Sequence, residues 1–191
     1  MDIRLRIIVL FSYLYGFFEI FMGVRQRIKR KSKVVQKSDK GSIWLMLFLI
    51  AAGYFLGFNA KYSGAGEIDL RNTLFVAGII IMFSGLIIRI KSIQTLKQQF
   101  TYTVKKIENH RLVEKGLYKK IRHPGYLGQL LIFFGVAVAF SNWLSTILMF
   151  TPVLAGYLNR IRIEERFLKL HFGQNYIDYQ GRTKKLIPGI F

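Results

Sequence analysis

Cysteine is absent from this chain of 191 residues, and acidic residues are scarce. The lack of cysteine excludes disulfides, thiolate metal sites and a cysteine nucleophile. Only 10 Asp and Glu stand against 29 Lys and Arg, which gives a formal net charge of +19. The basic residues fall in blocks between apolar runs, whereas a nucleic-acid-binding protein spreads them over a polar face. The charge pattern therefore argues against a nucleic-acid partner. We also expect no metal site.

The apolar content exceeds that of an ordinary soluble domain. Apolar residues make up 52% of the chain and aromatic residues 15%, with a mean hydropathy of +0.29. This composition predicts a membrane protein. The first apolar run follows Arg4 and Arg6 as in a signal peptide, but it continues to Val24 and meets a basic segment instead of a small-residue cleavage site. We therefore expect it to be retained as a span.

Long apolar runs predict the membrane-spanning segments, because a helix needs about 20 mostly apolar residues to cross a bilayer. Residues 127–157 are too many for one span and are broken at Ser141 and Asn142, which predicts a helical hairpin turning there. We therefore predict an all-α integral membrane protein with five transmembrane helices, the last two forming a C-terminal hairpin. The predicted spans are residues 5–24, 43–59, 73–90 and the two arms within 127–157.

Three basic blocks follow the first, third and fifth predicted spans. They cover residues 25–40, 92–122 and the tail 159–191. Five spans with an outside N-terminus place all three blocks on one side, and the positive-inside rule makes that side cytoplasmic. We therefore expect a multi-pass protein with its C-terminus and its polar loops in the cytoplasm, in contact with the lipid bilayer.

Two features inside the spans have more than one interpretation. Glu19 is an acid within the first span, where such residues are functional candidates by default; near the cytoplasmic end it could equally snorkel or pair with Arg25. Gly53 and Gly57 have the small-xxx-small spacing that lets helices approach closely. For these glycines we expect packing within the chain more than dimerisation.

A polar stretch at residues 110–128 lies between apolar runs and carries ring and charged side chains that no span requires. We interpret it as a ligand site. Pro124 suits the first position of a helix, since it has no N–H to leave unpaired, and this predicts a helix continuing into the apolar run. The alternative for His123 is a capping or interface histidine, and Tyr118 and Tyr126 could be residues of the interfacial aromatic belt.

The second constellation is Arg160 with Glu164 and Glu165, where the fifth predicted span leaves the apolar region. In a helix Arg160 and Glu164 share a face, so a surface ion pair is one interpretation. In the other, a glutamate holds a cationic or hydroxyl-bearing ligand and Arg160 holds an anionic one.

The order of these motifs resembles the isoprenylcysteine carboxyl methyltransferase family over roughly residues 94–191. In that family S-adenosylmethionine donates a methyl group to the carboxylate of a prenylated C-terminal cysteine. The three N-terminal spans in residues 1–91 are predicted from their apolar runs and resemble the family only in being apolar. The resemblance implies a methyltransferase core in residues 92–191, and we expect both parts to form one structural unit. The motifs that carry it are Gly116-Leu117-Tyr118, Arg122-His123-Pro124-Gly125-Tyr126-Leu127-Gly128, Arg160 with Glu164-Glu165, Phe172-Gly173-Gln174-Asn175-Tyr176, and Pro188.

The resemblance also implies roles for individual residues and a cytoplasmic cofactor pocket. Arg160 and Glu164 are the expected catalytic residues, with Arg160 engaging the acceptor carboxylate. A glutamine contact of the family has no evident counterpart, because Thr103 or Lys105 stands in its place. The expected S-adenosylmethionine shell is His110, Arg111, Leu112, Val113, Tyr118, His123, Pro124, Gly125 and Tyr126, completed by Glu164 or Glu165.

Two rival enzyme classes share part of this pattern. A phospholipid N-methyltransferase acts on an amine that must lose a proton, so Glu164 would serve as a base and Arg160 would hold the phosphate. A carboxylate acceptor is already ionised at neutral pH and needs no base. Sterol reductases, which use NADPH, share a similar Arg-His-Pro region but are much longer. A non-enzymatic basic scaffold on anionic lipid would leave residues 116–128 unexplained.

Overall fold

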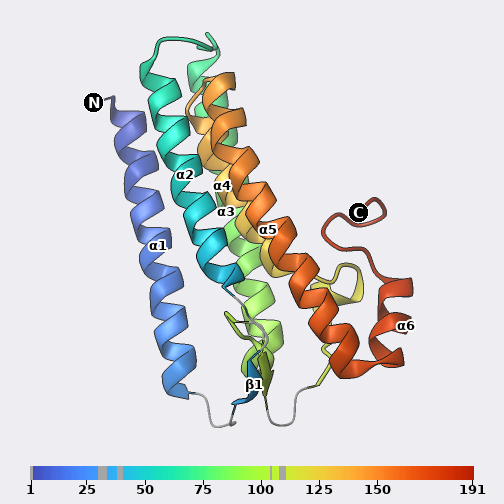
Figure 1. Cartoon of the computed structure of the whole chain (residues 1–191). Coiled ribbons are helices and arrows are strands. Elements are labelled where there is room, and N and C mark those ends of the chain that lie inside the picture. Colours follow the sequence, from blue (N-terminus) through green and yellow to red (C-terminus); the bar gives the residue numbers. More distant parts are fainter. Residues whose placement is uncertain (1, 30–33, 38–40, 104, 108–110) are drawn as a thin grey trace.

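Five long helices run up and down in a bundle, with a short sixth helix beside its lower half (Figure 1). The computed structural model describes residues 2–29, 34–37, 41–103, 105–107 and 111–191. The 3-10 helices η1 (Lys97–Gln99) and η2 (Gly116–Lys119) lie in the connection between α3 and α4. The helices are α1 (Ile3–Lys29), α2 (Ser42–Tyr62), α3 (Arg71–Leu96), α4 (Pro124–Ala139), α5 (Trp143–Phe172) and α6 (Gln174–Arg182).

The predicted C-terminal hairpin is confirmed. α4 ends at Ala139 and α5 begins at Trp143. Ser141 adopts a positive φ of 52° in the turn, and the Asn142 side chain caps α5 by accepting a hydrogen bond from the Ser145 amide at 2.8 Å. The predicted helix start is also confirmed, because Pro124 occupies the first turn of α4.

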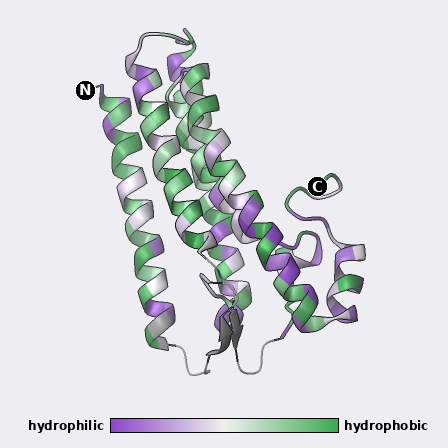
Figure 2. Ribbon diagram, in the orientation of Figure 1, coloured by the Kyte–Doolittle hydropathy of each residue, from purple (hydrophilic) through white to green (hydrophobic). Residues whose placement is uncertain are grey.

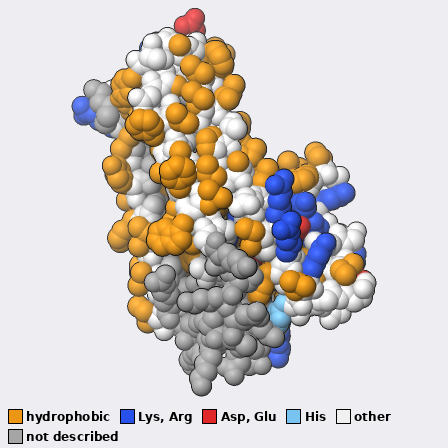
Figure 3. Space-filling model, viewed as in Figure 1, with side chains coloured by type: hydrophobic (Ala, Val, Ile, Leu, Met, Phe, Trp, Pro, Cys, Tyr) orange, Lys and Arg blue, Asp and Glu red, His pale blue; other side chains and the backbone are white. Residues whose placement is uncertain are grey.

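The outer surface of the bundle is apolar, which makes this a membrane protein. By length and composition, residues 3–26, 42–62 and 71–99 could each cross a bilayer, and α4 is a shorter apolar helix. Large side chains such as Phe17, Phe48 and Phe55 remain about 70% exposed. The hydrophobic colouring of the helices in Figure 2 and the apolar surface in Figure 3 follow the same distribution. An exposed apolar belt of this extent fits lipid and would be unfavourable in water.

The helices that precede the basic sequence blocks end on one side of the bundle. α1 and α3 both end opposite to the N-terminus, and the last half of α5 extends beyond α2 toward α6 (Figure 1). Lys and Arg side chains gather beside this part of the surface in Figure 3. That this end is cytoplasmic stays a prediction.

The all-α prediction missed a small sheet. Strand β1 (Val34–Lys37) pairs antiparallel with β2 (Lys105–Ile107), and the register Val34↔Ile107 is followed by an irregularity. These segments lie in the two polar loops at the same end of the bundle. Their backbone N–H and C=O groups satisfy one another there, a long-range pairing that the polar loop sequences did not reveal.

Glycines let α3 and α4 touch backbone to backbone. A Cβ atom at Gly128 would lie 2.7 Å from the Gly85 carbonyl oxygen, and one at Gly135 would lie 2.6 Å from the Gly78 oxygen. Both separations are too short for a real side chain. The two glycine pairs therefore fix the height of α4 against α3, and with it the position of the loop that precedes α4.

The predicted packing of Gly53 and Gly57 within the chain is confirmed. Both face Met149 on α5, where a Cβ at Gly53 would come within 2.5 Å of the Met149 carbonyl oxygen. This contact aligns α2 with α5.

The third helix continues past the predicted end of its span at residue 90. It runs to Leu96, so the predicted polar segment from Ser92 begins inside a helix. Arg89 and Ser92 are 3% and 1% exposed. These two side chains are polar but buried, so the helix continues beyond the point where the apolar run in the sequence ends.

Candidate active site

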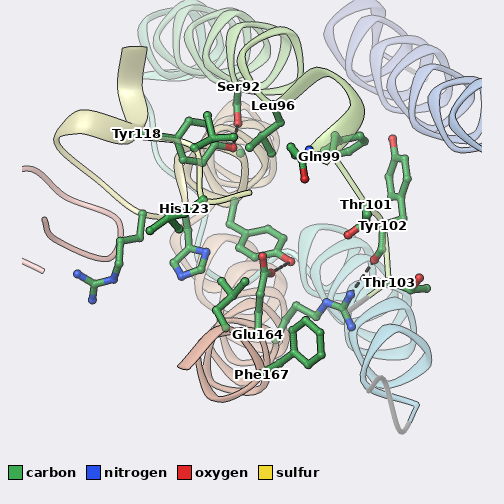
Figure 4. A pocket seen from close by; sticks show the side chains of 18 of the residues that line it. Ser92, Leu96, Gln99, Thr101, Tyr102, Thr103, Tyr118, His123, Glu164 and Phe167 are labelled. Carbon is green, nitrogen blue, oxygen red and sulfur yellow. Dashed lines mark hydrogen bonds between the residues drawn. The ribbon is translucent and has the colours of Figure 1, made fainter. Parts of the chain in front are cut away.

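A cavity opens where α3 ends, α4 begins and α5 passes the end of the bundle. Its volume is about 1130 Å³, including the solvent space at its open mouth. In Figure 4, Ser92 and Tyr118 lie opposite Glu164 and Phe167, and His123 lies across the cavity from Tyr102. The lining therefore combines segments that are far apart in the sequence.

Most of the sequence-predicted site residues line this one cavity. Pro124 begins α4 beside it, and Glu165 lies behind it, paired with Arg122. His110 lies outside the described residues. Gln99 and Thr103 also line the cavity, the latter at a position where the family glutamine was expected. The predicted residues in the lining are Arg111, Leu112, Val113, Tyr118, His123, Gly125, Tyr126, Arg160 and Glu164.

The first turn of α4 faces the cavity with a free backbone donor. The amides of Tyr126 and Leu127 donate to the His123 carbonyl at 3.1 and 3.0 Å. The Gly125 amide has no acceptor among the described residues. A helix N-terminus with an unused N–H is suited to an anionic group.

The backbone before α4 is held by the segment that follows α6. The Arg122 amide donates to the Lys184 carbonyl at 2.8 Å, and the His123 amide donates to the Lys185 carbonyl at 3.0 Å. The Lys184 amide donates in return to Lys120 at 3.1 Å. This ladder orients His123 toward the cavity.

Glu164 is the glutamate of the pair that lines the cavity. The Tyr126 hydroxyl donates to its Oε2 at 2.6 Å, and the Tyr126 ring stacks on the His123 ring with centroids 5.6 Å apart. A carboxylate placed there can accept hydrogen bonds from an ammonium or hydroxyl group of a ligand.

Glu165 braces the wall of the cavity. Its Oε1 accepts from Arg122 Nε at 2.8 Å and lies 3.4 Å from His123 Nε2. Burial raises the pKa of the carboxyl group, but the hydrogen bonds from His123 and Arg122 outweigh this effect, and the resulting pKa is about 2. Glu165 is therefore ionised at neutral pH and committed to protein partners.

Arg160 is buried at the opposite wall, with a 2% exposed side chain. It donates through Nη1 to the Ser42 hydroxyl and through Nη2 to the Tyr102 carbonyl at 2.7 Å. The bond to Tyr102 is drawn in Figure 4. Partners on α2 and on the loop after η1 therefore fix this guanidinium, so the intrahelical pair with Glu164 is not needed to explain its position.

The sequence interpretation missed an ion pair that joins two helices beside the cavity. Glu19 on α1 binds Arg89 on α3, with Nε–Oε1 and Nη2–Oε2 distances of 2.8 Å each. Of the interpretations left open for Glu19, the pairing with Arg25 is not the one observed, because Arg89 is the partner. Arg89 also lines the cavity. Two opposite charges near the same end of separate predicted spans were the signal for this pair.

Hydrogen bonds also connect η2 to α3 and α6. The hydroxyl groups of Tyr118 and Ser92 lie 2.7 Å apart, and the Tyr179 hydroxyl donates to the Tyr118 carbonyl at 2.8 Å. Burial raises the pKa of Tyr118, so its phenol stays protonated at neutral pH. Tyr118 thus lines the cavity and also links η2 to α3 and α6.

Known proteins share this architecture and parts of this sequence. A model of the phospholipid methyltransferase family matches residues 73–175, which include most of α3 and all of α4 and α5. A solved structure of the eukaryotic intramembrane Ras methyltransferase, isoprenylcysteine carboxyl methyltransferase, superposes with a TM-score of 0.60 and 27% identity. That likeness covers 75% of this chain and 52% of the other.

Curated relatives are also named as isoprenylcysteine methyltransferases. The chain is 34% identical to protein-S-isoprenylcysteine O-methyltransferase B of Arabidopsis thaliana over 58% of this chain and 57% of that protein. It is 32% identical to the protein-S-isoprenylcysteine O-methyltransferase of Saccharomyces cerevisiae over 60% of this chain and 49% of that protein. The matches thus span about half the length of these relatives. More than half of the chain, including most of the cavity wall, matches the family model, and the chain belongs to the phospholipid methyltransferase family.

Proposed function

We propose that this protein is an S-adenosylmethionine-dependent methyltransferase that esterifies the C-terminal carboxylate of a prenylated cysteine. One observation carries the proposal: a single cavity at the polar end of an apolar bundle is lined by the start of α4, by Glu164 and by Arg160. The names of the matched relatives support the carboxylate acceptor.

The donor set of the cavity suits S-adenosylmethionine. The Gly125 amide, at the positive end of α4, can receive the carboxylate of the donor. Glu164 can accept from its ammonium group or its ribose hydroxyls. When bound, S-adenosylmethionine supplies an electrophilic methyl group on a sulfonium sulfur, with S-adenosylhomocysteine as the product. In the proposed shell Glu164 contacts the donor, and Glu165 holds His123 and Arg122 in place.

The other half of the cavity suits a lipid-tailed carboxylate. Arg160 provides a fixed guanidinium, the side chain best matched to a carboxylate. Apolar side chains lie in the same lining, among them Ile43, Met46, Phe167 and Leu168. A prenyl chain would be accommodated by these residues while its carboxylate meets Arg160.

Alignment and exclusion of water account for the catalysis in this proposal. The acceptor carboxylate is ionised at neutral pH. Its oxygen–carbon bond forms as the sulfur–carbon bond breaks, so no proton moves and no residue acts as a base. Both reacting groups lose charge, which favours a water-poor site. The contribution of Arg160 is to hold one carboxylate oxygen in line with the methyl group.

The proposed topology has five spans, with the N-terminus outside and the cavity facing the cytoplasm. Its support is that α1 and α3 end at the same end of the bundle (Figure 1) and that basic blocks follow both helices in the sequence, which the positive-inside rule places in the cytoplasm. Residues 1–91 and 92–191 form one unit in this proposal. Because the chain has no cysteine, single cysteines introduced at Gly64 and at Lys115 can be tested for labelling by an impermeant reagent. Labelling of Lys115→Cys from outside intact cells would overturn this orientation.

The function is tested with purified protein in detergent and radiolabelled S-adenosylmethionine. A farnesylated cysteine analogue and phosphatidylethanolamine are offered in parallel. Base-labile label on the cysteine analogue is expected, because a methyl ester hydrolyses in base. Base-stable label on the lipid would instead establish N-methyl transfer, the alternative that the family name favours.

A further inference from the structure

Glu19 lies at the centre of a buried polar network that reaches from α1 to the cavity. Its carboxylate accepts four hydrogen bonds: from Tyr15 at 2.7 Å, from the two nitrogens of Arg89 at 2.8 Å and from the Tyr102 hydroxyl at 2.8 Å. The Glu19 side chain is 16% exposed and that of Arg89 4%. A carboxylate at this depth is retained only when it is fully paired.

The first arm of this network positions Arg89. The bonds to Glu19 use Nε and Nη2 of Arg89, while Nη1 lies 3.0 Å from the place that a Cβ atom of Gly125 would take. The guanidinium also lies over the rings of Phe100 and Tyr102, 5.2 and 5.8 Å from their centroids. Its third nitrogen is thus directed toward the start of α4.

The second arm reaches Arg160 through one residue. Tyr102 donates its hydroxyl to Glu19 and accepts at its backbone carbonyl from Arg160 Nη2 at 2.7 Å. The Glu19 carboxylate therefore holds Arg89 directly and Arg160 through Tyr102. Both guanidinium groups line the cavity.

This carboxylate comes from outside the region that the family model matches, which begins at residue 73. Apart from Glu19, residues 7–24 of α1 carry no charged side chain, and α1 exposes many of its apolar side chains. A simple anchor for α1 would not require contact with two cavity residues. The shared partners therefore point to a role in the site.

We infer that Glu19 is a positioning residue for methyl transfer, which holds Arg160 in the acceptor half of the cavity through Tyr102 and holds Arg89 beside the start of α4, and so makes α1 part of the active site. This inference rests on the proposed function. It assigns Glu19 chiefly to the binding of the acceptor carboxylate, because Tyr102 joins it to Arg160, and to a lesser degree to the donor side, because Arg89 lies beside the start of α4.

The test compares Glu19→Gln with wild type in the methyl-transfer assay. The amide keeps the size of the side chain but loses its charge and replaces one acceptor by a donor. We expect the KM for the farnesylated cysteine analogue to rise about tenfold, and the Kd for S-adenosylhomocysteine to rise less, by about threefold, because Arg89 beside the start of α4 is loosened. The matched control is Glu67→Gln, which removes an exposed carboxylate paired with Lys61 and Arg71 in the loop between α2 and α3.

Two further variants separate positioning from anchoring. Glu19→Asp retains the charge and is expected to recover part of the lost acceptor affinity. Tyr102→Phe removes only the hydroxyl arm, which keeps the test available if Glu19→Gln does not fold; a rise of about threefold in acceptor KM is expected. The inference is overturned if Glu19→Gln weakens acceptor binding and S-adenosylhomocysteine binding equally. It is also overturned if the acceptor kinetics are unchanged in both Glu19→Gln and Tyr102→Phe. A wild-type chain that methylates no prenylated cysteine contradicts the proposed function itself.

Discussion

Arg122 and Glu165 form the ion pair that ties the motif before α4 to α5. Arg122 Nε lies 2.8 Å from Glu165 Oε1, and Nη1 of the same guanidinium donates to the carbonyls of Gln180 and Thr183 at the end of α6. The side chains are 8% and 11% exposed. Three elements thus meet at one arginine, directly behind the cavity wall.

The variant Glu165→Gln should lose stability at neutral pH. It leaves buried Arg122 without its anion, and we expect a loss of about 2 kcal/mol. The pKa of Glu165 is lowered in the folded chain from 4.5 to about 2. Its contribution is therefore fully present above pH 4.5 and is lost as the pH falls toward 2. Thermal unfolding in detergent between pH 3 and 7 measures this, and a wild-type advantage that grows on acidification would contradict it.

The variant Arg160→Ala should impair acceptor use far more than cofactor binding. Loss of a charge-assisted contact to the acceptor carboxylate predicts a fall of about 10- to 150-fold in kcat/KM for the cysteine analogue. Affinity for S-adenosylhomocysteine is measured in parallel. The control Ser42→Ala removes one partner of the guanidinium but leaves the charge. If Arg160→Ala lowered the affinity for S-adenosylhomocysteine by the same factor as kcat/KM for the cysteine analogue, Arg160 would not be specific to the acceptor.

The variant His123→Ala should chiefly weaken cofactor binding. The ring lies 3.4 Å from Glu165 and stacks on Tyr126, so its loss disturbs the shell at the start of α4. We expect the Kd for S-adenosylhomocysteine to rise about tenfold, measured by calorimetry. Unchanged affinity with lost turnover would instead give His123 a direct chemical role.

The variant Gly128→Ala should destabilise the bundle. The added methyl group would lie 2.7 Å from both the Gly85 carbonyl oxygen and the Arg89 amide nitrogen. Overpacking of this kind costs about 1–3 kcal/mol. Gly16→Ala on α1 is the control, because nothing lies within 4 Å of its added methyl group. Similar melting temperatures of the two variants in detergent would refute the close contact of α3 with α4.

The sequence predicted the helices well because apolar runs and helix-start residues are local signals. The turn at Ser141 and Asn142 and the start at Pro124 were both visible in this way. The extension of α3 to Leu96 was not, since Arg89 and Ser92 are polar residues whose burial depends on partners in other elements. The pairing of β1 with β2 is likewise a long-range event with no apolar pattern to announce it.

The candidate site was predictable where the resemblance supplied motifs. The structure brings nine of the predicted residues into one cavity, while their roles stay predictions. Glu164 and Glu165 could not be separated by sequence, because only the rotation of α5 decides which one faces the cavity. Glu19 and Arg89 were missed as a pair, since their contact joins segments that no local spacing relates.

The hydrogen bonds from Arg122 and His123 to Lys184 and Lys185 have a consequence for biosynthesis. The whole α4–α5 hairpin lies between these two segments, so a nascent chain emerging from the ribosome must insert both arms before the ladder can form. The cavity wall is therefore completed only after residues 184 and 185 have been synthesised. A chain interrupted before residue 184 would be expected to contain the helices and still be unable to hold a ligand.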